Sequence, residues 1–284
     1  MFSLQNPRII LHQAKKYAKK ALGQHFLMQS DIARSMVEQA DICETDQIIE
    51  IGPGLGALTV HLSRQSNTVY AIDLDASLLA LLSIELEKIG IDNVNLIHGD
   101  ILKVSLDSVI SENTDARWIV MGNLPYHISS QIIVKLIKER KYISQAVVML
   151  QKEMADRIQS PPGSKAYGRL SVMLQYCARI HPLMQISGND FFPRVKVDSQ
   201  VIQIQFLDHV DPAVYDENAL FKVVKAAFGK RRKTIVNALR SGLTCDADFI
   251  TDALVKVGID PRCRAESISV NDFVRLTNQM DGYL

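Results

Sequence analysis

The sequence predicts an α/β protein with a Rossmann-like sheet, followed by a small all-helical C-terminal domain. Before Leu207, short apolar runs alternate with segments of helical periodicity, as in parallel sheets covered by helices. The first such run, residues 47–51, is followed at once by a glycine-rich turn over 52–56 and by a helix. A strand, a glycine-rich turn and a helix in this order form the nucleotide-binding βα unit. After Leu207 the composition shifts, and the remaining pattern is that of short helices.

Length and composition are those of a globular chain. With 284 residues, of which 47% are hydrophobic and 22% charged, it can form one large core and a smaller appended domain. No apolar run approaches the about 20 residues of a membrane span, and the start lacks the residue order of a signal peptide. The four cysteines are far apart and form no Cys-x-x-Cys pair. This predicts reduced thiols in a cytoplasmic protein, with no metal site and no membrane partner.

Basic residues gather in two places, although the formal net charge is only +1. Residues 1–25 form a basic N-terminal arm, and a second cluster lies near the other end of the chain. The clustered residues are Lys15, Lys16, Lys19, Lys20, Lys230, Arg231, Arg232 and Lys233. Most charge runs are solvated helix faces, but a locally basic surface on a neutral protein also suits a polyanion bound along one face.

The other elements follow from apolar periodicity and turn residues. Gly23 permits a turn at the end of the arm, Phe26 and Leu27 are expected to anchor the arm to the core, and Ser30 offers a helix N-cap. Helices are expected over residues 30–40, 57–64, 76–89, 129–141, 151–157, 169–177, 216–228, 233–240, 246–257 and 270–280. Strands are expected over 47–51, 68–72, 94–97, 118–121 and 146–150, with a hairpin pair over 181–186 and 201–206. The loop 160–168 and the linker 208–212 are rich in breakers.

Three successive predicted strands each deliver a polar residue at the carboxyl end, namely Asp73, Asp100 and Asn123. In an open α/β sheet, ligands bind in the crevice beyond these strand ends. One such acid could be a simple turn former, but the same placement three times indicates a ligand. Asp73 lies at roughly the ~20-residue interval at which an acid meets ribose hydroxyls. A P-loop is excluded because Gly56 is followed by Ala57 instead of lysine.

The segment Asn-Leu-Pro-Tyr at 123–126 is the most informative part of the sequence. Pro125 fixes its own φ and favours an extended Leu124. The loop then presents an amide, a free carbonyl and the Tyr126 ring, which can accept hydrogen bonds from an exocyclic amino group and stack on the base that bears it. Because asparagine and proline are common turn residues, an ordinary turn is the more frequent meaning of this motif alone.

A methyl donor with an adenosine half would explain both the crevice and the loop. Asp73 would hold its ribose hydroxyls, Asp100 would accept from its adenine amine, and the glycine turn would pass beneath its amino-acid portion. The methyl group would point at the amine held by the loop 123–126. A nicotinamide oxidoreductase shares the βα unit, but the sequence has no Ser/Tyr–Lys pair of the expected spacing.

Five segments jointly carry a resemblance to a known family. They are EIGPGLG at 50–56, NLPY at 123–126, LQKE at 150–153, KAYGRLSVM at 165–173 and KVDS at 196–199. Together they closely resemble the bacterial small-subunit ribosomal RNA adenine dimethyltransferases, the KsgA/RsmA family, over nearly the whole chain from Leu22.

This resemblance implies a class I methyltransferase domain over residues 26–207 and a helical RNA-binding domain over 208–284. It further implies that two adjacent adenosines near the 3′ end of small-subunit ribosomal RNA are dimethylated at N6 with S-adenosylmethionine. The implied partner is this RNA in the immature 30S particle, and we expect a monomer.

The resemblance also assigns site residues. It implies cofactor contacts by His25, Leu27, Glu50, Gly52, Gly54, Asp73, Asp100 and Asn123. It places the target base against Asn123, Leu124, Pro125 and Tyr126, with Phe191 stacking opposite Tyr126. The segment 228–240 has five cations and no acid, and this charge predicts RNA contacts by Lys230, Arg231, Arg232, Lys233 and Arg240. Three positions depart from the family pattern: His25 stands where asparagine is usual, Asp73 where glutamate is frequent, and Val195 where a loop proline is expected.

Other functions stay open on the sequence alone. The nearest is a large-subunit ribosomal RNA adenine methyltransferase of the antibiotic-resistance type, or an enzyme that methylates DNA adenine or a protein glutamine. A different class is a non-catalytic factor that checks ribosome assembly. The match at 165–173 and the helical tail favour small-subunit RNA.

Overall fold

The computed structural model describes residues 6–110, 116–230 and 232–283, which form two compact units. The first comprises Met1–Ala155 with Arg179–Phe206, and the second comprises Asp156–Ala178 with Leu207–Leu284. The unit boundary at Phe206 lies next to the domain boundary expected after residue 207. Residues 156–178, which the sequence assigned to the sheet domain, cluster instead with the C-terminal helices.

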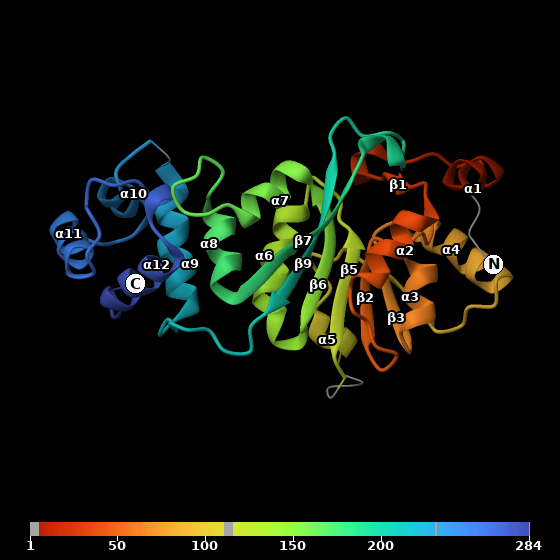
Figure 1. Cartoon of the computed structure of the whole chain (residues 1–284), viewed down its shortest axis with the longest axis horizontal. Coiled ribbons are helices and arrows are strands. Elements are labelled where there is room, and N and C mark those ends of the chain that lie inside the picture. Colours follow the sequence, from red (N-terminus) through yellow and green to blue (C-terminus); the bar gives the residue numbers. More distant parts are fainter. Residues whose placement is uncertain (1–5, 111–115, 231, 284) are drawn as a thin grey trace. The chain divides into compact units, whose positions relative to one another are not determined.

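The first unit is built on a sheet whose described strands have the order β4-β3-β2-β5-β6-β9-β7 (Figure 1). The strands are β2 (Gln47–Ile51), β3 (Thr68–Asp73), β4 (Val94–His98), β5 (Trp118–Asn123), β6 (Gln145–Gln151), β7 (Ala178–Ile186) and β9 (Ser199–Phe206). The first five strands in this order run parallel, and β9 is antiparallel to β6. The chain order reverses between β2 and β5, so a crevice is expected beyond their carboxyl ends.

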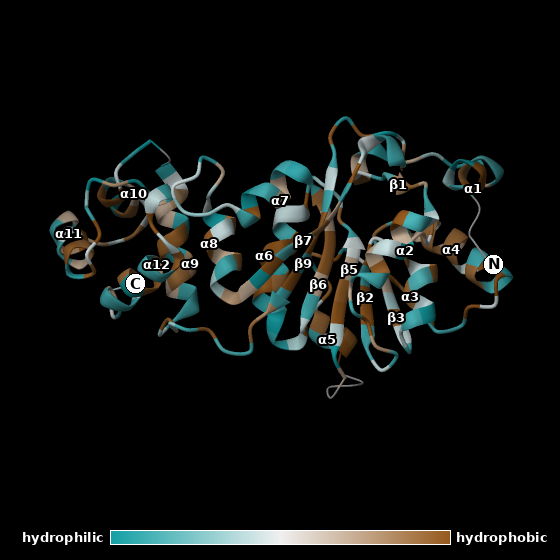
Figure 2. Ribbon diagram, in the orientation of Figure 1, coloured by the Kyte–Doolittle hydropathy of each residue, from teal (hydrophilic) through white to brown (hydrophobic). Residues whose placement is uncertain are grey.

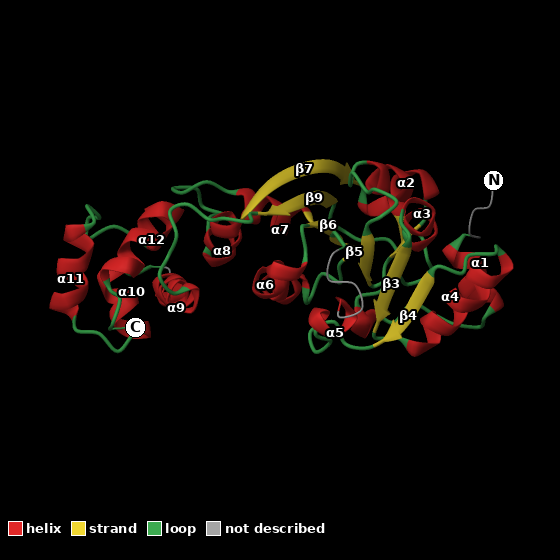
Figure 3. Ribbon diagram, turned by 90° about the horizontal axis from the view of Figure 1, so that it is seen from below, coloured by secondary structure: helices red, strands yellow, loops and turns green. Residues whose placement is uncertain are grey.

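Helices cover both faces of this sheet, with α2 and α3 on one face and α5 and α6 on the other (Figure 3). The helices of this part of the chain are α1 (Pro7–Gln13), α2 (Ser30–Glu38), α3 (Thr59–Gln65), α4 (Ala76–Lys88), α5 (Leu106–Ile110) and α6 (Ser129–Glu139). Short 3-10 turns are η1 (Lys20–Leu22), η2 (Arg140–Tyr142) and η3 (Gly188–Asp190). A separate two-stranded ribbon joins β1 (Phe26–Leu27) to β8 (Phe191–Phe192).

The central strands are apolar because helices bury them on both faces. All five residues of β2 are buried, and Figure 2 shows β2, β5 and β6 coloured mainly as hydrophobic. Gly122 in β5 is required by close packing, since a Cβ there would lie 2.4 Å from the Ile51 carbonyl oxygen. β5 therefore continues through Gly122, where the sequence predicted its end, and finishes at Asn123.

The predicted strands and helices of the sheet unit are confirmed. Besides the end of β5, the main differences are the ribbon strands β1 and β8, which the sequence did not predict, two further helices and one helix cap. The N-terminal arm contains a helix, α1, which begins with Pro7 at its first turn and is capped by Asn6. The short helix α5 was also not predicted. Ser30 is the first helical residue and not the N-cap, which is Gln29 without a side-chain capping bond.

The second unit consists of helices. The chain passes from the first unit to the second within α7 (Lys152–Gln159). The other helices are α8 (Arg169–Cys177), α9 (Glu217–Ala227), α10 (Ile235–Gly242), α11 (Ala247–Lys256) and α12 (Val270–Gln279), with turns η4 (Phe228–Lys230) and η5 (Ala265–Ser267). Leu220 and Val223 of α9 and Leu239 of α10 are fully buried, so this unit has a core of its own. No described helix has both the length and the apolar character needed to span a bilayer.

Candidate functional site

A cavity of about 280 Å³ opens in the first unit at the carboxyl ends of β2, β3, β4 and β5. It is lined by the turns that follow these strands and by the end of the N-terminal arm. All eight predicted cofactor residues line it: His25, Leu27, Glu50, Gly52, Gly54, Asp73, Asp100 and Asn123. Leu124, Pro125 and Tyr126 line it as well. The structure thus brings together residues from five separate stretches of sequence, because parallel strands end at the same edge.

The glycine turn after β2 brings backbone to the edge of the cavity. Gly52 and Gly54 have φ values of 71° and 56°, a left-handed conformation that favours glycine. The Gly52 amide donates to the Ile72 carbonyl at 2.9 Å, which fixes the turn on β3. A Cβ on Gly54 would lie 3.2 Å from the Phe26 ring, so a larger residue would press on the arm.

Asp73 ends β3 with its carboxylate held by backbone amides. One carboxyl oxygen accepts from the Asp75 amide at 2.8 Å, and the other accepts from the Gly54 amide at 3.2 Å. Burial raises the pKa of Asp73, and the two amides partly oppose that rise. The turn after β2 and the end of β3 therefore fix one another.

Asp100, in the turn after β4, is a partly exposed carboxylate on the cavity wall. Its Oδ1 accepts from the Leu102 amide at 3.0 Å, and its Oδ2 lies 3.9 Å from the Lys103 ammonium group. The side chain is 28% exposed, so it can still accept a hydrogen bond from a ligand.

Glu50 places a buried carboxyl oxygen without a described partner at the cavity wall. The residue is 1% exposed, and its Oε2 has no hydrogen-bond partner in the described part of the chain. Burial raises the pKa of Glu50 to about 8; the charge of Asp73 adds to the rise, and the nearby Thr59 partly opposes it. Buried polar atoms are seldom left without a partner, so this oxygen is available to a ligand in the cavity.

Asn123 has one half of its amide fixed by the arm. Its Nδ2 donates to the His25 carbonyl at 3.0 Å, and Oδ1, which has no partner among the described residues, is the acceptor end of the side chain. The Leu124 amide donates to the Met149 carbonyl at 3.2 Å, which ties the loop after β5 to β6. The acceptor predicted from the sequence is therefore set in a definite orientation.

Tyr126 is held at both its hydroxyl and its ring. Its hydroxyl lies 2.6 Å from Ser199 Oγ at the start of β9, and burial raises the pKa of the phenol. The ring of His25 lies nearly parallel to that of Tyr126, with 6.2 Å between centroids, and His25 Nδ1 is 2.8 Å from the Pro193 carbonyl. Ser199 was not singled out from the sequence, although it ends the KVDS segment that carried part of the resemblance.

The role predicted for Phe191 is wrong in this structure. Phe191 is fully buried in the core with Met36 and pairs with Leu27 between β8 and β1, so neither face of its ring is open to a base. The adjacent Phe192 is partly exposed, and the Arg8 guanidinium lies 4.9 Å from its ring centroid.

The predicted RNA-binding residues lie in the second unit. Lys230, Arg232, Lys233 and Arg240 are exposed on η4, on the following loop and on α10. Arg231 lies outside the described residues. No cluster of three or more histidine, cysteine or acidic side chains that could hold a metal ion occurs within the described ranges.

Comparisons with known proteins indicate the same family. The model of the ribosomal RNA adenine dimethylases matches residues 15–281. Ribosomal RNA small subunit methyltransferase A from Desulforapulum autotrophicum is 41% identical over 275 residues, which cover 96% of each chain. The protein of the same name from Geobacillus kaustophilus is 41% identical over 267 residues, covering 92% of this chain and 90% of the relative.

Two solved structures share the fold. A dimethyladenosine transferase from Plasmodium falciparum superposes with a TM-score of 0.74 at 24% identity, covering 88% of this chain and 95% of that one. The 23S ribosomal RNA methyltransferase ErmE superposes with a TM-score of 0.67 at 20% identity, covering 90% and 99%. Both likenesses confirm the predicted fold class.

Proposed function

The chain belongs to the ribosomal RNA adenine dimethylase family, and from this premise we propose that it dimethylates N6 of two adjacent adenosines near the 3′ end of small-subunit ribosomal RNA. The names of relatives that match over almost their full length support the small subunit as the substrate. The observation that carries the proposal is the fixed Asn123 amide at the edge of the cavity, with Oδ1 left as an acceptor beside Tyr126.

The residues of the cavity fit S-adenosylmethionine. The unpartnered carboxyl oxygen of Glu50 suits the ammonium group of its amino-acid portion. The left-handed Gly52 and Gly54 keep side chains away from the space that this portion needs. Asp73 suits the ribose hydroxyls, and Asp100 suits the adenine amine. When bound, the cofactor supplies an electrophilic methyl group on a sulfonium centre.

The chemical difficulty lies in the adenine amine, whose lone pair is delocalised into the ring. Two acceptors, Asn123 Oδ1 and the Leu124 carbonyl oxygen, accept hydrogen bonds from the two N–H groups of this amine. These hydrogen bonds direct the lone pair of the amine into the cavity. Because Asn123 is already fixed by the His25 carbonyl, little reorganisation is needed when positive charge develops on nitrogen. Orientation of this kind supplies much of the rate. A cationic N6 loses its proton readily, so no dedicated general base is required.

The target adenosine must leave its stack in the RNA before it can enter the site. Stacking on Tyr126 replaces part of the lost interaction, at roughly 1–3 kcal/mol per base. The Ser199 hydroxyl holds the phenol, so the ring is presented in one orientation. The exposed cations Lys230, Arg232, Lys233 and Arg240, together with Arg231, are proposed to contact phosphates of the same RNA.

In the test, the purified protein and methyl-labelled S-adenosylmethionine are incubated with one of two substrates. These are immature small ribosomal subunits and naked large-subunit RNA. We expect label in the small-subunit RNA alone, and mass spectrometry should find two adjacent N6,N6-dimethyladenosines near its 3′ end. Label confined to the large-subunit RNA would overturn the substrate. If the protein binds the cofactor but labels neither RNA, the better conclusion is a non-catalytic ribosome assembly factor.

A further inference from the structure

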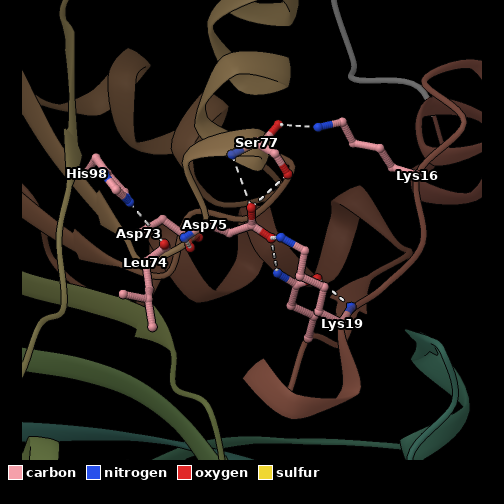
Figure 4. A network of polar contacts seen from close by, with 8 residues as sticks. Lys16, Lys19, Asp73, Leu74, Asp75, Ser77 and His98 are labelled. Atoms are coloured by element: carbon pink, nitrogen blue, oxygen red, sulfur yellow. Dashed lines mark hydrogen bonds and ion pairs between the residues drawn. The ribbon is translucent and has the colours of Figure 1, made fainter.

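The turn after β3 holds a second carboxylate that does not line the cavity. Asp75 lies two residues beyond Asp73, and its side chain is 3% exposed. The Lys19 ammonium group lies 2.9 Å from its Oδ2, which also accepts from Gln24 Nε2 at 2.9 Å (Figure 4). Its Oδ1 accepts from the Ser77 hydroxyl at 2.7 Å and caps α4 through the Ser77 amide at 3.1 Å. One carboxyl oxygen thus serves the helix, and the other fastens the arm.

The arm has further attachments to the same place. Gln24 Oε1 accepts from the Lys19 amide at 2.7 Å, which closes the arm segment on itself. Lys16 Nζ donates to the Ser77 carbonyl at 3.4 Å. Although burial raises it, the hydrogen bonds from Lys19, Ser77 and Gln24 bring the pKa of Asp75 well below its ordinary value. The carboxylate is therefore charged at every pH at which the protein would work.

The residue after Gln24 joins this attachment to the reacting end of the cavity. His25 supplies the carbonyl that accepts from Asn123 Nδ2 at 3.0 Å. Gly23, with φ of 64°, turns the chain at this point, and a Cβ there would lie 3.0 Å from His127 Nδ1. A shift of the arm would release the Asn123 amide, which could then rotate and present Nδ2 instead of Oδ1.

We propose that Asp75 is a positioning residue: by binding Lys19 and Gln24 it holds the His25 carbonyl in place, and this carbonyl orients the Asn123 amide toward the target amine. The inference rests on the proposed function for the role of Asn123. It assigns the basic arm a task inside the site. The two carboxylates of this turn then have different roles: Asp73 binds the cofactor, and Asp75 binds the N-terminal arm.

The test removes the arm's side of the attachment and leaves the α4 cap intact. The variant Lys19→Ala combined with Gln24→Ala keeps both bonds from Ser77 to Asp75. Lys88→Ala is the matched control, because Lys88 pairs with Glu85 at 2.6 Å at the other end of the same helix. Lys19→Arg is the conservative variant, since it retains the charge and can bond the same carboxylate.

Two measurements are made on each variant. The first is the side-chain amide NMR signal of Asn123, assigned as the pair missing from Asn123→Ala. The second is kcat for methyl transfer with cofactor and RNA both saturating. In the double variant we expect the amide to lose its hydrogen-bonded shift and its protection from exchange. We expect kcat to fall about tenfold or more, as misplacement at a reacting group does. Lys19→Arg and Lys88→Ala should resemble the wild type in both.

The outcomes separate cleanly. An unchanged Asn123 signal in the double variant overturns the proposal, and so does a released amide with undiminished kcat. If the wild-type chain transfers no methyl group to any RNA, the proposed function fails, and the amide signal alone decides whether the Asp75 attachment orients Asn123.

Discussion

The cavity of the first unit and the basic segment of the second, defined as residues 230–233 with Arg240, use polar side chains in opposite ways. In the cavity, Asp73, Asn123 and Tyr126 are partly buried, and each is fixed by a bond to a segment distant in sequence. In the basic segment, the described cations are exposed. The first region has its polar groups desolvated and oriented by folding, whereas the second leaves them in water.

This difference predicts two kinds of dependence. Oriented, partly buried groups recognise one geometry, so loss of a single atom changes chemistry sharply and salt matters little. Exposed cations act through the phosphate charge of any RNA, so each contributes modestly and its contribution falls as salt rises. Substitutions in the two regions should therefore differ in size and in the quantity that they change.

The largest effect is expected from Asn123→Ala. Removal of one preorganised hydrogen-bonding group from a reaction site costs about 10²–10³-fold in kcat. Calorimetric affinity for S-adenosylmethionine should stay within a few-fold of the wild type, because the other contacts remain. Asn95→Ala, at an exposed position of β4, is the control and should retain full turnover. A folded Asn123→Ala protein with normal kcat would contradict the role given to this amide.

The next effect concerns Glu50 and the pH dependence of stability. The pKa of Glu50 is about 8 in the folded chain against an ordinary value of 4.5, so between these values only the folded state holds the proton. Stability of the ligand-free protein should therefore fall by up to about 1.4 kcal/mol for each pH unit in this window as pH rises. Glu50→Gln should remove this pH-dependent part of the free energy of unfolding. The stability of the variant relative to the wild type should therefore increase as pH rises.

Urea unfolding at pH 5.5, 6.5 and 7.5 measures the difference. Glu87→Gln, at an exposed position on α4, is the control and should follow the wild type. Parallel curves for the wild type and Glu50→Gln would contradict a raised pKa and would show that Glu50 is ionised in the folded chain.

A smaller effect is expected from Ser199→Ala. Loss of the bond to the Tyr126 hydroxyl should lower kcat by about tenfold or less, in line with roughly 1 kcal/mol for one hydrogen bond. Tyr126→Phe removes the same bond from the other side and keeps the ring. The double variant should therefore be no worse than the poorer single variant. Additive losses would mean that the two hydroxyls act separately.

The smallest effect is expected from Lys233→Ala in the basic segment. If this lysine neutralises one phosphate, RNA affinity should fall only a few-fold, and the slope of log K against log salt should become shallower by roughly 0.7–0.9. Fluorescence anisotropy with labelled RNA at several salt concentrations measures both. Cofactor affinity should not change. A loss of affinity that is independent of salt would contradict a phosphate contact.

The contents of the cavity wall could be read from the sequence because they depend on local pattern. Apolar runs of strand length fix where β2, β3, β4 and β5 end, and the polar residue after each run then lies at a common edge. Gly52 and Gly54 predicted a turn that brings the backbone close to a ligand. For the same reason, the predicted residues from Glu50 to Tyr126 all line one cavity.

The contacts between distant segments could not be read in this way. The bonds from Lys19 and Gln24 to Asp75 cross 56 and 51 positions of sequence. Ser199 lies 73 positions from Tyr126. Such pairings depend on how the arm and β9 dock on the sheet, and periodicity within a segment contains no information about docking.

The sequence by itself determined the sheet, the helical second unit and the set of residues at the strand ends, since strand alternation and turn chemistry act over a few residues. Only the tertiary structure decided which faces of adjacent residues are buried. In the ribbon, Phe26 pairs with Phe192 and Leu27 with Phe191, and this register turns Phe191 into the core. Successive side chains of a strand point to opposite faces, and the face that meets the core is chosen by the partner strand.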